Sequence, residues 1–255
     1  MILVIDAGNT HTVLGLFDGP ALKAHWRLFT GNYRTDDELR IQVNMLLHFE
    51  GVDPETITGC CYSSVVPPLD AALNGLCRNG FGVEPVVVGP GVKTGLVIQV
   101  DNPKEVGADR IVNAVGAREK YEGPLIVVDF GTATTFDAIS AAGEYRGGCI
   151  VPGIQISSSA LFEKCAKLPR VDITQPQKHV IGKDTVAHIR AGLTFGYADL
   201  TDGLIRRMAN ELGGDPAVVA TGGFAPLIAD IATGIHHVEP VLTLNGLRAI
   251  HGKNR

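Results

Sequence analysis

Short runs of apolar residues, many of them β-branched, open the chain and recur near its middle. Residues 3–5 and 125–128 are such runs, and each leads into Asp-x-Gly followed by small polar residues. Runs of this kind are typical of strands in the interior of a sheet, and glycine permits a tight turn after them. The chain then returns in a second apolar stretch, at residues 12–17 and 135–139. The pattern therefore predicts the same unit of strand, turn and strand twice.

Either copy alone is explained by an ordinary hairpin, because Asp and Gly are common turn residues. Recurrence of the whole pattern at the start of two similar halves favours a functional interpretation. In that interpretation each carboxylate holds a cation, directly or through water, and the turn N–H groups and nearby side chains donate to phosphate oxygens. The candidate side-chain donors are Asn9, Thr10, Thr132 and Thr134.

Apolar residues at helical spacing predict helices between the strands. Thr35 and Glu38 form a capping-box pattern before such a helix. The other predicted elements are a hairpin at Gly19-Pro20, strands at 57–65, 85–88 and 217–220, and helices near 69–78, 155–164 and 226. A long helix is predicted from residue 185 to about 212, and its Gly192, Gly196 and Gly203 suit close packing against another helix, such as one across a dimer interface. This alternation implies an α/β fold with a mainly parallel or mixed sheet covered by helices.

Residues 88–95, Val-Gly-Pro-Gly-Val-Lys-Thr-Gly, have the composition of a phosphate-binding loop. A Walker A loop needs glycine immediately before the lysine, and Val92 occupies that position. We interpret this segment as an ordinary turn.

Composition narrows the classes of function. The 255 residues can form one large domain or two, and the duplicated pattern favours two halves, 1–118 and 119–255. A net charge of −5 without a cluster of Lys and Arg argues against a nucleic-acid-binding surface. The five cysteines show no C-x-x-C spacing, so neither a zinc site nor a disulfide framework is predicted. The sequence shows no leader-like start, and no apolar run approaches the roughly 18 residues that a membrane span needs. We therefore expect a reduced, cytoplasmic protein with no membrane partner.

A third candidate element begins at Gly107-Ala108-Asp109-Arg110, before a run with a helical apolar face. Spacing alone slightly favours a structural role, with Asp109 as a first-turn acid and Arg110 as a solvated charge. In the functional alternative, the carboxylate accepts a proton from a substrate hydroxyl while the guanidinium holds a substrate carboxylate. Two further segments are similarly open between a structural and a binding role: Thr221-Gly222-Gly223, which could lie against an adenosine, and Gly182-Lys183-Asp184-Thr185.

The order and spacing of these motifs resemble the type III pantothenate kinases, members of the acetate and sugar kinase, Hsp70 and actin superfamily. The resemblance runs nearly end to end. It rests on Asp6-Ala7-Gly8-Asn9-Thr10, Gly107-Ala108-Asp109-Arg110, Val128-Asp129-Phe130-Gly131-Thr132-Ala133-Thr134-Thr135, Gly147-Gly148-Cys149-Ile150-Val151-Pro152-Gly153 and Ala220-Thr221-Gly222-Gly223.

The resemblance implies two ribonuclease-H-like, actin-like ATPase domains, with mixed sheets flanked by helices and a ligand cleft between them. It also implies ATP-dependent phosphorylation of pantothenate to 4'-phosphopantothenate, the first step of coenzyme A biosynthesis, by a homodimeric phosphotransferase with an alcohol acceptor.

The matching motifs imply a role for each site residue. The residues implied for the ATP phosphates are Asp6, Ala7, Gly8, Asn9, Thr10, His11, Thr12, Val13 and Thr132, with Asp6 also holding Mg²⁺ through water. Those implied for pantothenate are Gly107, Ala108, Asp109, Arg110 and Thr185, with Asp109 as the proton acceptor. Asp129 is the position implied for a monovalent cation, K⁺ or NH₄⁺.

Three positions depart from the family pattern. His11 stands where the family often has Asn, Val100 where an aromatic residue usually lies near pantothenate, and Lys183-Asp184 where Arg-Asn usually precedes Thr185. Two alternatives remain: a nucleotide-binding transcriptional regulator of the same family, or another small-molecule kinase of the same fold. An intact Asp109 and Arg110 favour catalysis, because a protein that only binds nucleotide needs no base.

Overall fold

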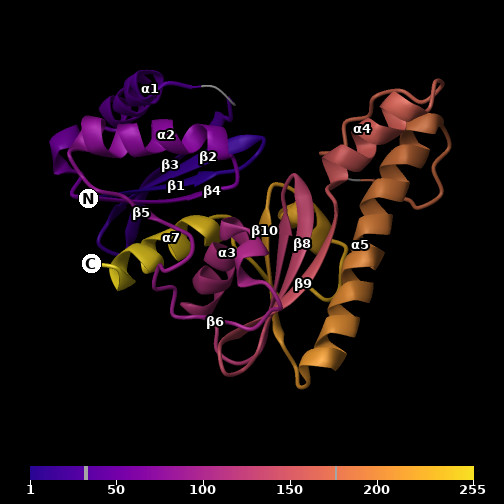
Figure 1. Ribbon diagram of the computed structural model, residues 1–255. Coiled ribbons are helices and arrows are strands. Elements are labelled where there is room, and N and C mark those ends of the chain that lie inside the picture. Colours follow the sequence, from indigo (N-terminus) through magenta and orange to yellow (C-terminus); the bar gives the residue numbers. More distant parts are fainter. Residues whose placement is uncertain (32–33, 176) are drawn as a thin grey trace. The chain divides into compact units, whose positions relative to one another are not determined.

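The computed structural model describes residues 1–31, 34–175 and 177–255. The chain forms two compact units, each built on one sheet (Figure 1). Unit 1 contains Met1–Leu96, Asp101–Glu119 and Leu242–Arg255, and unit 2 contains Val97–Val100 and Lys120–Val241.

The sheet of unit 1 is mixed, as the sequence pattern predicts. Its strands are β1 (Ile2–Ala7), β2 (His11–Asp18), β3 (Ala21–Phe29), β4 (Gly59–Ser64) and β5 (Val86–Val87), in the order β3-β2-β1-β4-β5. β1 runs antiparallel to β2 and parallel to β4. The predicted hairpin between β2 and β3 turns at Gly19, whose φ of 57° is a left-handed conformation that glycine adopts readily.

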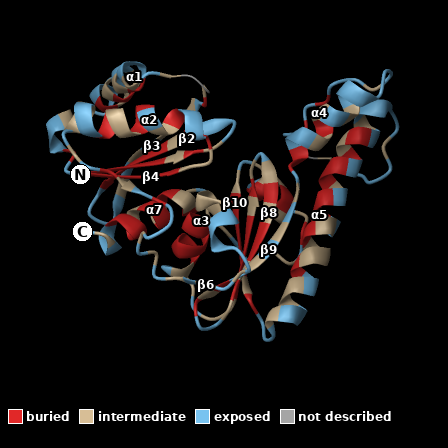
Figure 2. Cartoon of the chain, in the orientation of Figure 1, coloured by how far each residue is buried: buried red, intermediate tan, exposed pale blue. Residues whose placement is uncertain are grey.

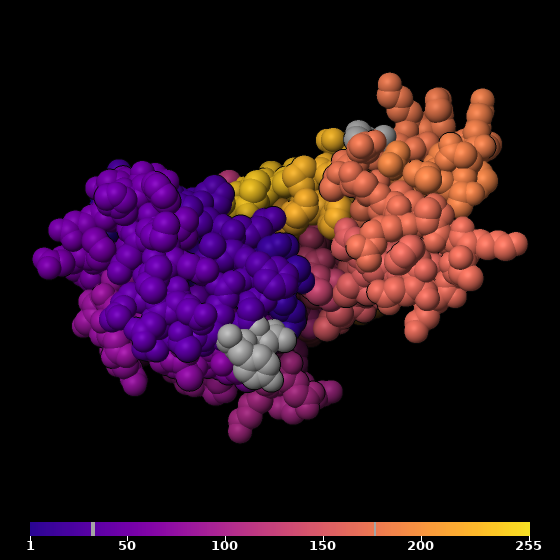
Figure 3. Space-filling model, turned by 90° about the horizontal axis from the view of Figure 1, so that it is seen from above, coloured from indigo at the N-terminus to yellow at the C-terminus, as the bar shows by residue number. Residues whose placement is uncertain are grey.

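Two helices cover one face of this sheet, α1 (Asp36–Phe49) and α2 (Pro67–Gly75), and the π-helical turn η2 (Leu76–Gly80) continues α2 (Figure 1). In the view of Figure 3, from above, the indigo and purple atoms of the N-terminal part of the chain form this surface of unit 1. A short turn, η1 (Pro54–Thr56), precedes β4. Leu3 and Ile5 of β1 pack with Leu39 and Val43 of α1 in a fully enclosed core, where the strands and the inner faces of the helices are buried (Figure 2). Each such side chain contributes roughly 1.5–3 kcal/mol of burial free energy to the fold.

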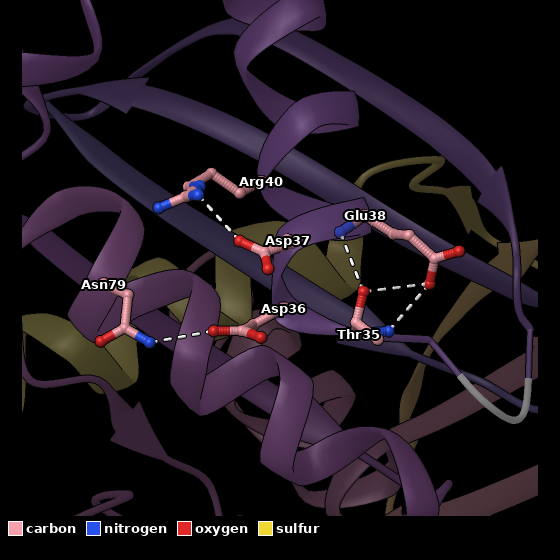
Figure 4. Close-up of polar contacts among 6 residues, drawn as sticks. All are labelled: Thr35, Asp36, Asp37, Glu38, Arg40 and Asn79. Carbon is pink, nitrogen blue, oxygen red and sulfur yellow. Dashed lines mark hydrogen bonds and ion pairs between the residues drawn. The ribbon is translucent and has the colours of Figure 1, made fainter.

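The start of α1 confirms the predicted capping box (Figure 4). The Thr35 hydroxyl accepts from the Glu38 N–H at 3.2 Å, and the Glu38 carboxylate accepts from the Thr35 N–H at 2.9 Å. Asn79 of η2 donates to the Asp36 carboxylate at 2.9 Å, which ties the same end of α1 to the α2 layer. A reciprocal cap of this kind satisfies N–H groups that the first helical turn leaves without partners.

The opposite face of the sheet is covered by α7 (Leu242–Lys253), which contacts β1 and β4 and packs against α3 (Ala108–Arg118). The short turn η3 (Pro103–Glu105) leads into α3. The two helices approach closely because each carries a glycine at the crossing. A Cβ on Gly246 would lie 2.1 Å from the Val112 carbonyl oxygen, and one on Gly116 would lie 2.6 Å from that of Leu242.

Unit 1 therefore differs from the first predicted half, residues 1–118. The last 14 residues, Leu242–Arg255, belong to unit 1 rather than to the second half of the chain, whereas Val97–Val100 belong to unit 2. The reason is that α7 buries Leu244, Leu247 and Ile250 against unit 1, a pairing between segments remote in sequence.

The sheet of unit 2 repeats the strand arrangement of unit 1. Its strands are β6 (Val97–Ile98), β7 (Leu125–Phe130), β8 (Ala133–Ile139), β9 (Glu144–Pro152), β10 (Ala217–Gly222) and β11 (His237–Val238), in the order β11-β10-β7-β8-β9-β6. Reading β7 for β1, β8 for β2 and β10 for β4 reproduces every pairing and direction around the central strand. The duplication predicted from two short motifs thus extends to whole sheets.

The helices of unit 2 are α4 (Ile154–Lys164), α5 (Thr185–Leu212) and α6 (Ala225–Ala229), close to the predicted positions. Ile189, Leu193 and Tyr197 of α5 pack with Val128 and Phe130 of β7 in the core of this unit. Among the residues that the structure describes, no helix is both long and apolar enough to span a membrane.

Candidate active site

The first candidate site is the Asp6 turn, which we define as residues 6–12, at the end of β1. Asp6 stands opposite Val13 of β2 and Ser63 of β4. The Ser63 hydroxyl donates to Asp6 Oδ1 at 2.7 Å, which fixes the orientation of the half-buried carboxylate. The Gly8 N–H donates to the His11 carbonyl at 3.1 Å, and Asn9, Thr10 and His11 are exposed. The turn therefore presents a fixed carboxylate and several polar groups to solvent, a combination that suits phosphate and a hydrated cation.

Thr30, which sequence analysis did not single out, braces the Asp6 turn from the end of β3. Its hydroxyl donates to the Gly8 carbonyl at 2.7 Å, so the hydroxyl of Thr12, 2.9 Å away, must donate to Thr30. The Thr30 N–H also donates to the Thr10 carbonyl at 3.0 Å. Thr12 is buried and its hydroxyl is used in this bracing. Ala7 is buried as well, so it meets a ligand only through its backbone.

The second candidate site is the Asp129 turn, residues 129–134, at the end of β7. Asp129 stands opposite Thr135 and Thr221, the positions equivalent to Val13 and Ser63 in unit 1. Thr132 is exposed at the tip of the turn. The proposal that Thr134 donates to phosphate is wrong for its side chain, because Thr134 pairs with Phe130 and is fully buried in the core.

Two glycines allow neighbouring segments to approach the Asp129 turn. Gly222, with φ of 92°, lies so close that a Cβ would be 2.6 Å from both Asp129 Oδ1 and the Phe130 carbonyl oxygen. A Cβ on Gly153 would be 2.1 Å from the Thr132 carbonyl oxygen and 2.8 Å from that of Gly131. Glycine is therefore required at position 222 by the packing of the turn. Around Gly223, no heavy atom of the described residues lies within 4 Å of a Cβ placed there, so that space is open to a ligand.

The third candidate site is the start of α3. Gly107 is the N-cap and Asp109 lies in the first turn, where Asp109 Oδ1 accepts from the Arg110 N–H at 2.8 Å. A Cβ on Gly107 would be 2.5 Å from this oxygen, so a larger residue at position 107 would displace the carboxylate from its place over the helix end. Burial raises the pKa of Asp109, and the N–H and charge of Arg110 only partly oppose that shift. A carboxyl of raised pKa in the first turn of a helix has the basicity that a general base needs.

The three departures from the family pattern also have defined surroundings. Partial desolvation and the nearby charge of Arg27 lower the pKa of the exposed His11 below its ordinary 6.5, and a neutral imidazole can donate a hydrogen bond as Asn would. Val100 packs against Gly147 in unit 2. Asp184 is the N-cap of α5, accepting from the Ala187 N–H at 2.8 Å, which leaves the exposed Thr185 as the first residue of the helix.

The candidate residues are thus distributed over both units. Unit 1 carries the Asp6 turn and Gly107–Arg110, whereas unit 2 carries Asp129, Thr132 and Thr185. Among the described residues, no group of three or more His, Cys, Asp or Glu side chains could by itself hold a metal ion. A divalent cation at the Asp6 turn would accordingly depend on ligands from a bound phosphate or from water.

Comparison with known proteins places this arrangement in a family. A family model described as type III pantothenate kinase matches residues 2–207. A curated type III pantothenate kinase from Anaeromyxobacter sp. (strain Fw109-5) is 55% identical over 255 residues, covering 100% of both chains. One from Myxococcus xanthus is 54% identical over 254 residues, covering 100% of this chain and 99% of the other.

Solved structures of lower identity share the fold. A Campylobacter jejuni protein described as a Baf family transcriptional activator superposes with a TM-score of 0.62 at 19% identity, covering 99% of this chain and 98% of the other. A ROK hexokinase from Thermus thermophilus gives a TM-score of 0.52 at 16% identity, covering 99% and 97%. These similarities and the repeated mixed sheets confirm the predicted fold class, an α/β fold with two mixed sheets flanked by helices. On the strength of the family model and the curated relatives, the chain belongs to the type III pantothenate kinases.

Proposed function

We propose that the chain transfers the γ-phosphoryl group of ATP to pantothenate, giving 4'-phosphopantothenate, the first step of coenzyme A biosynthesis. Family membership supports the kinase activity and the substrate. The observation in the structure that carries the proposal is Asp109, a half-buried carboxyl of raised pKa in the first turn of α3, beside Gly107. A protein that only binds nucleotide, such as a regulator, has no need of this base, and the family assignment does not favour that alternative.

Phosphoryl transfer depends mainly on positioning and charge neutralisation, with a base at the attacking hydroxyl. We assign the ATP phosphates to the polar groups of the Asp6 turn and to Thr132, which is exposed at the tip of the Asp129 turn. Pantothenate would be held by residues 107–110 and Thr185, with the guanidinium of Arg110 on its carboxylate. The Asp109 carboxylate would then accept the proton of the substrate hydroxyl as that oxygen attacks phosphorus.

Two cations fit the residues of these turns. Asp6 offers a carboxylate oriented by Ser63, which suits a Mg²⁺ ion that keeps its water and binds the phosphates. The Asp129 carboxylate and the Phe130 carbonyl oxygen both lie close to Gly222, and oxygen ligands of this kind suit K⁺ or NH₄⁺. When bound, these cations would neutralise the phosphate charge that develops during transfer.

The test of the proposal is ADP release from Mg-ATP, measured with and without pantothenate in K⁺ and in Na⁺ buffers. We expect turnover that requires pantothenate and is stimulated by K⁺. Pantothenate-dependent turnover that is equal in both buffers would remove the cation role of Asp129 and leave the reaction standing. Folded protein that binds ATP but shows no pantothenate-dependent turnover in any cation would refute the proposed substrate.

Asp109→Asn tests the base directly. We expect kcat to fall by about 10²- to 10⁴-fold, the usual contribution of a general base, while the circular dichroism spectrum stays unchanged. A folded variant that retains a third or more of wild-type kcat would exclude Asp109 as the proton acceptor.

We also propose that the chain is a homodimer that associates through α4, α5 and residues 177–184, which precede α5. Gly192, Gly196 and Gly203 of α5 have no heavy atom within 4 Å of a Cβ placed on them. Large apolar side chains are exposed in the same region, namely Ile156, Phe162, Val180, Ile181 and Val186. An exposed apolar surface next to an open glycine row suits close packing against a second helix.

A further inference from the structure

The hydroxyl of Tyr197, in the middle of α5, lies at the junction of three segments of unit 2. It donates to the Pro152 carbonyl at the end of β9, at 2.7 Å. It also lies 2.6 Å from the Ser157 hydroxyl in the first turn of α4. Because the tyrosine proton is used on Pro152, Ser157 must donate to the tyrosine oxygen. The Tyr197 side chain is 9% exposed and its ring belongs to the core, whereas Ser157 is half-buried and Pro152 is exposed.

The backbone that Tyr197 holds is the backbone that supports the Asp129 turn. Pro152 stands opposite Ala133, which is the first residue of β8 and lies within the Asp129 turn. Gly153 follows directly, and its Cα lies against the Gly131 and Thr132 carbonyls so closely that a Cβ would be 2.1 Å from the Thr132 oxygen. A shift of residues 152–153 therefore moves Thr132 or opens a gap beside it, because close-packed interiors transmit displacement rather than absorb it.

We propose that Tyr197 is a positioning residue for the phosphate contact of the Asp129 turn, acting through Pro152 and Gly153. Because proline has no N–H, the carbonyl of Pro152 is its only backbone group that can form a hydrogen bond. A hydrogen bond to this carbonyl therefore fixes the peptide directly. The inference rests on the proposed function in one respect, the assignment of Thr132 to an ATP phosphate. It also gives the Gly147–Gly153 motif a role, namely to end β9 at a residue that can lie against the turn.

The test is Tyr197→Phe, which removes the hydroxyl and keeps the ring in the core. We expect KM for Mg-ATP to rise by about 5- to 10-fold, because small misplacements of positioning groups are costly, with KM for pantothenate unchanged within about twofold. Ser157→Ala should give a smaller increase, because Tyr197 can still donate to Pro152.

Tyr62→Phe is the matched control. Tyr62 is buried in unit 1 and its hydroxyl accepts from Asn74 at 2.8 Å, so this variant loses a comparable hydrogen bond away from the Asp129 turn. Both KM values of the control should stay within about twofold of wild type.

Calorimetric titration with Mg-ADP separates this inference from the proposed function. If the wild type binds nucleotide but does not phosphorylate pantothenate, the proposed substrate fails, and a selective loss of nucleotide affinity in Tyr197→Phe still supports the inference. Unchanged nucleotide affinity and KM in a folded Tyr197→Phe variant would overturn it. The inference would also be overturned if Tyr197→Phe changed the KM for Mg-ATP and the KM for pantothenate equally and Tyr62→Phe produced the same changes. That result would indicate a general loss of stability.

Discussion

Asp109 combines a catalytic assignment with a cost in stability. Burial raises its pKa above the ordinary 3.8, so the folded chain binds this proton more tightly than the unfolded chain does. Stability therefore falls as the pH rises from 3.8 through the raised pKa. Active sites commonly contain such groups, which are strained in the resting protein and useful in the reaction.

We predict that Asp109→Asn is more stable than the wild type at pH 7, although it is inactive. The neutral amide avoids the burial of a charge, and the advantage should shrink as the pH falls toward 4, where Asp109 becomes protonated. Thermal unfolding at several pH values measures this difference, with Asp215→Asn, at an exposed aspartate, as the control. A variant less stable than wild type at pH 7 would show that the contacts with Arg110 outweigh the cost of burial.

Single residues also show where sequence reasoning stops. The carboxylates Asp6 and Asp129 were predicted at strand ends because an apolar run followed by Asp-x-Gly is a local signal. The burial of Thr12 and Thr134 was not predicted, because a hydroxyl near a turn looks the same in sequence whether it faces solvent or the core. Thr30 was missed because its partners, Gly8 and Thr12, are about 20 residues away and no periodicity links them.

At the scale of elements, the pairing of α3 with α7 decides which part of the chain completes unit 1. The crossing depends on Gly116 and Gly246, each facing backbone of the other helix. We predict that Gly246→Ala destabilises the chain by at least about 2 kcal/mol, because its Cβ would meet the Val112 carbonyl. Gly252→Ala, on the same helix with open space around it, should instead stabilise by about 0.5–1 kcal/mol through helix propensity.

Urea unfolding of both variants measures these opposite effects. If Gly246→Ala is as stable as Gly252→Ala, the two helices can separate without loss, and the assignment of residues 242–255 to unit 1 fails.

Elements with local signals were predicted well and those defined by distant pairing were not. The capping box of Thr35 and Glu38, the length of α5 and the proline at the start of α6 all lie within a few residues of the feature they determine. By contrast, α7 was not predicted to join the first half, because its partners lie more than 100 residues earlier. The distance between Asp109 and either turn is likewise not encoded in any short motif.

At the scale of the whole molecule, duplication explains why the same chemistry occurs twice. Both sheets place a carboxylate at the end of the central strand, with a hydroxyl residue opposite it on the parallel neighbour: Ser63 for Asp6 and Thr221 for Asp129. The copies then diverge, because Ser63 donates to its aspartate while Gly222, after Thr221, is pressed against the other. One carboxylate accepts a hydrogen bond from a hydroxyl and the other lies against glycine backbone, so the surroundings of the two turns differ although their strands repeat.

The last prediction concerns association of two chains. If the surface formed by α4, α5 and residues 177–184 is the dimer interface, sedimentation should give about twice the chain mass of 27.0 kDa at micromolar concentration. Ile181→Asp should weaken the dimer at least tenfold, because Ile181 is 84% exposed in the single chain and a buried unpaired carboxylate is costly. Ile41→Asp is the matched control, since Ile41 is 61% exposed on α1 of unit 1. A monomeric wild type would refute the homodimer. If only Ile41→Asp dissociates the dimer, the interface instead involves α1, where Ile41, Met45 and Phe49 form an exposed apolar stripe at helical spacing.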